Sequence, residues 1–149
     1  MRLLNIAAIL ACLLLSSLSC EQKWVITSNE VTGKLDTRSF TYSGNVKIQA
    51  KDATITCEKL NGTLDDDEKI KELTATGSVY IVNSEGVEVF GEKAVYDQSA
   101  KTITITGNPK MLRNKNSLIA SEIVYYLASN TFEARGGVET IIFEETPKR

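Results

Sequence analysis

The 149-residue sequence contains no histidine. A chain without histidine cannot use Ser-His or Cys-His catalysis, imidazole acid–base chemistry or His-ligated zinc. An enzyme built on this chain would depend on carboxylates, lysine or tyrosine, and no pair of carboxylates stands in a recognisable catalytic frame. The sequence therefore predicts a protein that is not an enzyme and that uses no cofactor and no metal.

The sequence also lacks an excess of positive charge, and it has few cysteines. The formal net charge is −2, so the chain lacks the basic footprint of a nucleic-acid-binding protein. The one acidic run, "DDDEK" at residues 65–69, lacks the alternating spacing of a calcium-binding loop and is interpreted as a solvated turn. Of the three cysteines, Cys57 stands in the strand-like stretch "ATITCEKL" and is predicted to be a small buried residue.

The amino terminus has the layout of a secretory signal: Arg2, an apolar run from Leu3 to Leu18, and small residues before Cys20. We interpret residues 1–19 as a lipoprotein-type signal peptide, Cys20 as the acylated first residue of the mature protein, and residues 20–29 as a tether. This interpretation predicts a membrane-anchored protein. Ordinary cleavage, retention of the segment as a membrane anchor, and processing at Cys12 are the alternatives.

No amphipathic helical pattern occurs after residue 24. The chain instead shows short runs rich in β-branched and aromatic residues, with polar and apolar residues alternating, and turn-forming stretches separate them. Examples are "NVKIQA", "SVYIV", "KTITIT" and "VETIIF". The sequence therefore predicts an all-β fold.

A glycine recurs before strand-like runs, at Gly44, Gly77, Gly107 and Gly136, with intervals of 33, 30 and 29 residues. This spacing predicts about three short strands per repeat around one core. We expect each glycine to adopt a positive φ or a bulge where the sheet turns a corner. Small residues between the glycines are expected at a second corner: Ala50, Gly91 and Ala120. Pro109, which cannot donate to a ladder, should lie at a strand's first position or edge.

The motifs "GEKAVYD", "ITGNPKM" and "IASEIVYY", in this order within residues 87–137, resemble the OstA/LptA/LptC family of lipopolysaccharide-transport proteins. The resemblance implies a twisted, partly open β-jelly-roll (a β-taco) over residues 30–144, followed by a tail at 145–149. It also implies an apolar groove for the acyl chains of lipopolysaccharide, a periplasmic location, and end-to-end joining with other β-jelly-roll proteins into a bridge from the inner to the outer membrane.

Alternation selects the side chains that should face the interior. The same pattern suits a closed, filled core, so the alternative function is a structural or adhesive β-solenoid lipoprotein without a lipid ligand. Tyr80, Val82, Tyr126 and Leu127 are expected on the outer face. The predicted lipid-binding residues are Val46, Ile48, Val79, Ile81, Val87, Val89, Ile103, Ile105, Met111, Ile119, Ile123, Tyr125 and Phe132.

The terminal strand-like segments are predicted to lie at the ends of the roll. Exposed sheet edges allow another chain to add a strand. We therefore expect head-to-tail pairing through two groups of residues: Trp24, Val25 and Ile26 at the start, and Ile141, Ile142 and Phe143 at the end.

Overall fold

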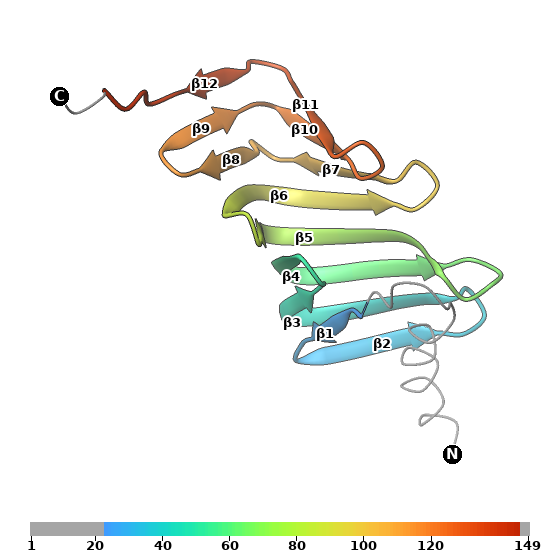
Figure 1. The fold of residues 1–149 in the computed structure, drawn as a ribbon. Helices are drawn as coiled ribbons and strands as arrows, with labels where there is room; N and C mark the ends of the chain where they lie inside the picture. The colour runs from blue at the N-terminus through green and yellow to red at the C-terminus, as the bar shows by residue number, and fades with distance from the viewer. Residues whose placement is uncertain (1–22, 147–149) are drawn as a thin grey trace.

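The computed structural model describes residues 23–146, which form one antiparallel sheet of twelve strands and contain no helix (Figure 1). The all-β prediction is confirmed. The predictions for residues 1–19 and Cys20 lie outside the described residues. The strands are β1 (Val25–Thr27), β2 (Glu30–Lys34), β3 (Ser39–Gln49), β4 (Ala53–Leu64), β5 (Ile70–Asn83), β6 (Val87–Asp97), β7 (Thr102–Thr106), β8 (Lys110–Arg113), β9 (Asn116–Ile119), β10 (Glu122–Tyr126), β11 (Thr131–Arg135) and β12 (Glu139–Ile141).

The recurring glycines form a line of corners through the sheet. Each is followed by a second residue with positive φ: Gly44 (78°) by Asn45 (49°), Gly77 (82°) by Ser78 (46°), Gly107 (81°) by Asn108 (52°), and Gly136 (77°) by Gly137 (58°). The ladder register shifts beside Gly44 and Gly77. The prediction of positive φ at a corner is thus confirmed at all four glycines.

The corners divide the sheet into two arms. Arm 1 contains β1, β8, β9 and β12, and arm 2 contains β2, β7, β10 and β11; in Figure 1, β8, β9 and β12 lie to the left of β7, β10 and β11. The four long strands β3 to β6 run through both arms and join them. Both ends of the sheet are open, with β1 and β2 at one end and β11 and β12 at the other.

Two of the three small residues, Gly91 and Ala120, precede Glu92 and Ser121, which contact the corner glycines Gly107 and Gly136, so these two do not form a second corner. A Cβ on Gly77 would lie 2.8 Å from the Glu58 Cβ, and one on Gly107 would lie 2.4 Å from the Glu92 Cβ. Gly91, next to Glu92, therefore belongs to this same corner. The expectation for Ala50 is wrong, because Ala50 lies in the turn between β3 and β4, where its N–H donates to the Ala53 carbonyl. In that repeat Cys57 and Glu58 occupy the corner.

Pro109 lies directly before the first residue of β8 and is fully buried. Its carbonyl accepts a hydrogen bond from the Ala120 N–H, 3.3 Å away, so the residue joins β9 without needing an N–H of its own. This confirms the prediction that Pro109 stays out of a ladder's centre.

The sheet begins inside the segment that the sequence assigns to a tether. β1 starts at Val25, and Ile26 pairs with Ile48 of β3. The strand-forming residues "WVIT" explain this, since β-branched side chains favour the extended backbone wherever a ladder partner is available.

Candidate functional site

The ladder register places apolar residues of successive strands side by side on one face, here called the inner face. In arm 1 one such row runs from Ile48 through Ile55, Ile81, Val89 and Met111 to Leu118. In arm 2 a second row runs from Tyr42 through Leu60, Ala75, Ala94 and Ile105 to Ile123. Apolar side chains thus continue along the sheet across six strands in each row.

Most of the predicted lipid-binding residues lie on this face. Six are buried, namely Val46, Ile48, Val79, Val89, Ile105 and Ile123. Four others are partly buried against the core, namely Ile81, Val87, Ile103 and Met111. Tyr125 and Phe132 continue the row of Ile103 towards the β11 edge, where the Phe132 side chain is 47% exposed. The structure brings these twelve residues together.

Ile119 is placed on the opposite face. It pairs with Lys110 of β8, whereas its neighbour Leu118 pairs with Met111 on the inner face. The sequence "SLIA" has two consecutive apolar residues, so alternation alone could not choose between them. The register, which the β8–β9 turn determines, selects Leu118.

The sequence prediction also missed several inner-face residues from the first part of the sheet. Phe40, Tyr42, Leu60 and Leu73 are buried in the same core as Val46 and Ile105. The alternation in "SFTYSG" signals Phe40 and Tyr42, but their position before the first corner glycine left them outside the repeat.

The two apolar rows of the inner face contain no charged residue. Among the described residues, the structure buries no charged side chain. Burial raises the pKa of Tyr42, whose hydroxyl finds no hydrogen-bond partner within residues 23–146, and it also raises the pKa of the Cys57 thiol. Such a surface is suited to apolar ligands and not to acid–base chemistry.

The outer face of arm 1 carries its own aromatic pair. The rings of Tyr80 and Phe90 are 4.9 Å apart, and the Tyr80 hydroxyl donates to Glu88 Oε1 at 2.6 Å. This hydrogen bond is the main cause that raises the Tyr80 pKa. The expected outer placement of Tyr80 and Val82 agrees with their pairing opposite Phe90 and Glu88.

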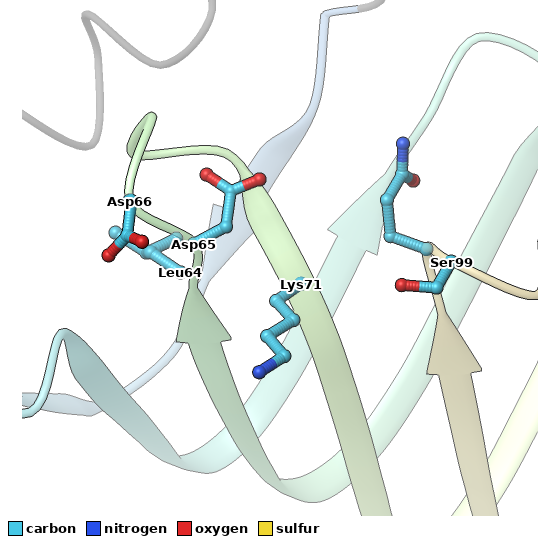
Figure 2. Close-up of a pocket in the computed structure, with 6 residues that line it drawn as sticks. Leu64, Asp65, Asp66, Lys71 and Ser99 are labelled. Carbon is cyan, nitrogen blue, oxygen red and sulfur yellow. The ribbon is translucent and has the colours of Figure 1, made fainter.

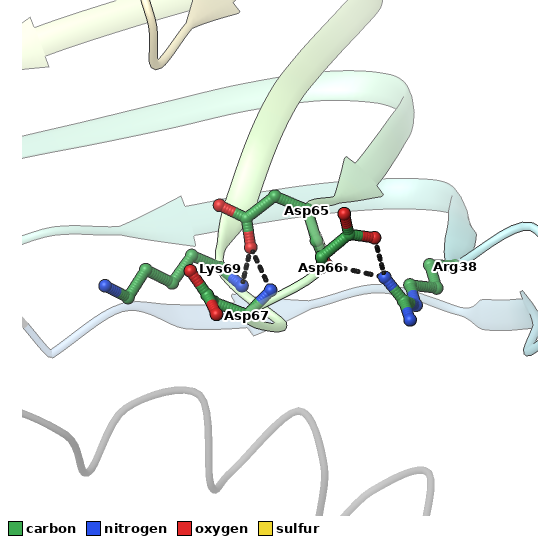
Figure 3. A network of polar contacts seen from close by, with 5 residues as sticks. All are labelled: Arg38, Asp65, Asp66, Asp67 and Lys69. Carbon is green, nitrogen blue, oxygen red and sulfur yellow. Dashed lines mark hydrogen bonds and ion pairs between the residues drawn. The ribbon is translucent and has the colours of Figure 1, made fainter.

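A polar pocket lies at the turns of arm 2. A pocket of about 250 Å³ is lined by Leu64, Asp65, Asp66, Lys71, Gln98 and Ser99 (Figure 2). Asp65 Oδ1 accepts hydrogen bonds from the N–H groups of Asp67 and Lys69, and Arg38 pairs with Asp66 (Figure 3). The acidic run is therefore a surface turn in which the carboxylates of Asp65 and Asp66 are bound by N–H groups of the same turn and by Arg38, respectively. No group of three potential metal ligands occurs within residues 23–146.

The predicted assembly residues lie at the two open ends of arm 1. Val25 and Ile26 belong to the edge strand β1, and Ile141 belongs to the edge strand β12. Ile142 and Phe143, just beyond β12, are 68% and 60% exposed. Trp24 differs from the rest, because it packs against the core and its ring centroid lies 6.2 Å from that of Tyr96.

Comparison with known proteins now identifies the family. The profile described as "LptA/(LptD N-terminal domain) LPS transport protein" matches residues 25–131. The chain belongs to this family. The family comprises transport proteins, in agreement with the prediction of a protein that is not an enzyme. Comparison with curated protein sequences finds no match.

A solved structure shows the same fold. It is the crystal structure of LptH, described as the LptA homologous periplasmic component of the conserved lipopolysaccharide transport device from Pseudomonas aeruginosa. The match has a TM-score of 0.74 at 14% identity, and it covers 83% of this chain and 97% of LptH. The predicted twisted, partly open β-jelly-roll is thus confirmed. In the part of the chain that the structure describes, no helix is long and apolar enough to cross a membrane.

Proposed function

We propose that this protein binds lipopolysaccharide in the periplasm and passes it along a bridge of similar domains from the inner to the outer membrane. The observation that supports this function most directly is the apolar inner face, on which each of the two rows continues across six strands of the sheet. An acyl chain gains roughly 0.8 kcal/mol for each CH₂ that it buries and needs no directional partner. Rows of aliphatic side chains, free of charge, meet that requirement.

The open ends support the bridge. An edge strand with unpaired backbone groups can pair with an edge of another copy or of a related domain. β1 and β12 are both edges of arm 1, so stacking two copies end to end would bring these edges together and continue arm 1 from copy to copy. The inner face would then continue as well, and a lipid could move along it.

A photocrosslinking experiment tests lipid binding. A photoreactive residue is placed at Ile81 or Ile103 on the inner face, and at the adjacent outer-face positions Val82 or Thr104 as matched controls. We expect lipopolysaccharide to crosslink from Ile81 and Ile103 and much less from Val82 and Thr104. Equal crosslinking from both faces, or none from the inner face, would contradict the proposal.

The tight packing of several inner-face residues favours a second candidate, a structural lipoprotein with a closed core. Val46 and Ile123 are only 1% and 0% exposed. In this alternative the interior is filled permanently and holds no lipid. Crosslinks from neither Ile81 nor Ile103, in protein that remains folded, would favour it.

The anchor is the remaining part of the proposal. Acylated Cys20 would tether the domain to a membrane through the short segment before β1. Mass spectrometry of the mature amino terminus tests this, since an added diacylglyceryl group on Cys20 is expected. An unmodified terminus at another residue would exclude the lipid anchor.

A further inference from the structure

The only tryptophan of the chain joins the two arms. Trp24 directly precedes β1, which pairs with β3 in arm 1, whereas Tyr96 lies in the arm 2 part of β6. Their ring centroids are 6.2 Å apart with the planes tilted by 47°. No ladder connects β1 to β6. The contact therefore passes across the inner face and does not follow the sheet.

Both rings occupy the apolar interior only in part. Trp24 and Tyr96 are half-buried and pack against the buried core. The Tyr96 hydroxyl donates to Gln98 Oε1, which holds the polar end of the ring at the turn beyond β6. The register places the Tyr96 ring in one row with Leu73 and Ile103. The indole thus contacts one member of the row that contains Ile103, a residue that the proposed function assigns to acyl chains.

The element that carries Trp24 is weakly attached. β1 has three residues and a single ladder partner, β3, at the open end of the sheet. Short edge strands with one partner open at much lower free energy than the central strands of a sheet. Moving Trp24 off the inner face therefore requires no change in β3 to β6.

We infer that Trp24 is a displaceable plug, which occupies the interior between the arms in the lipid-free protein and leaves Tyr96 when an acyl chain enters. The inference rests on the proposed function. A ligand that must displace a side chain binds more weakly, because only the fraction of molecules with an open site is competent. The plug lowers the affinity for lipid and so allows release to the next domain.

The sign of one affinity change tests the inference. Trp24→Ala should bind radiolabelled hexa-acylated lipid A about two- to tenfold more tightly than the wild type, as expected from losing one aromatic contact. A residue that merely lines the lipid site would have the opposite effect, because its removal would weaken binding. Thr27→Ala is the matched control, since it alters β1 on the outer face opposite Lys47 and should leave the affinity unchanged.

Quenching of the single tryptophan provides a second measurement in the unmodified chain. Adding lipid A should increase the quenching of Trp24 by acrylamide, because the indole leaves the interior. Weaker binding by Trp24→Ala, equal tightening by Thr27→Ala, or unchanged quenching at saturating lipid A would each overturn the plug. If the wild type binds no lipid A, the proposed function itself fails. Lipid binding without these changes refutes the plug alone.

Discussion

At the scale of single residues, the four corners show why this chain needs glycine at fixed intervals. Each corner glycine combines a positive φ with a close neighbour from an earlier strand or loop that lies beside it. The backbone conformation excludes most L side chains, and the neighbour excludes even a methyl group. The second corner residue, an asparagine, serine or glycine, also has a positive φ, which asparagine tolerates better than most residues.

Two alanine substitutions separate these effects. Gly77→Ala should lower the free energy of unfolding by about 2–4 kcal/mol, because it adds a clash with Glu58 to the backbone strain. Gly86 has a similar φ of 77° but an open environment, so Gly86→Ala should cost only the backbone strain, roughly 1–2 kcal/mol. Urea unfolding of both variants measures the difference. Equal losses would show that the corner contact is unimportant.

At the scale of the elements, the long strands and the short strands have different roles. β3 to β6 pass through the corners and join the two arms, while the remaining strands serve only one arm each. The short edge strands expose apolar side chains that a partner could cover, and β12 is followed by the exposed Ile142 and Phe143. Assembly and lipid entry, as proposed, both depend on these edges and not on the central strands.

Lysine substitutions at the β12 end test the role of that edge. Lysine at a sheet edge opposes the addition of a further strand. Ile141→Lys combined with Ile142→Lys should abolish concentration-dependent association in sedimentation experiments, without unfolding the monomer. Leu127→Lys, on an exposed side chain in the turn after β10 and outside β12, is the control and should associate like the wild type. Normal association of the double variant would exclude β12 as an interface.

At the scale of the whole molecule, the absence of histidine determines how stability depends on pH. No side chain with an ordinary pKa between 6 and 8 is present, so the free energy of unfolding should change little over that range. Burial raises the pKa of Cys57 from an ordinary 9.0, and it raises those of Tyr42 and Tyr96 from 10.0. The folded protein holds these protons more tightly than the unfolded chain.

The contribution of these protonated groups to the free energy of unfolding should therefore be fully present below pH 9. It should fall as the pH rises through 9 and 10 towards the higher pKa values of the folded protein. Urea midpoints measured from pH 6 to 11 test this. Tyr42→Phe removes one buried hydroxyl that has no hydrogen-bond partner among residues 23–146, so it should reduce the alkaline loss and leave the stability at pH 7 unchanged or higher. A wild-type midpoint that is constant up to pH 11 would contradict the expected linkage.

The sequence by itself determined the class of the fold and the position of its corners. Alternation predicted the strands, the glycine spacing predicted the turns of the sheet, and the lack of histidine excluded most catalysis. These properties depend on local backbone preferences, which a short stretch of residues expresses without its neighbours. Twelve of the thirteen predicted inner-face residues follow from the same local pattern.

The tertiary structure decided what depends on pairing between distant segments. The register of β8 with β9 turned Leu118 inward and Ile119 outward, although both are apolar neighbours. The alignment of β4 with β5 placed Cys57 and Glu58 at a corner and Ala50 in a turn. The Trp24–Tyr96 contact joins residues 72 positions apart and depends on the fold bringing the arms together. No local preference specifies such contacts, because they exist only once the whole sheet has formed.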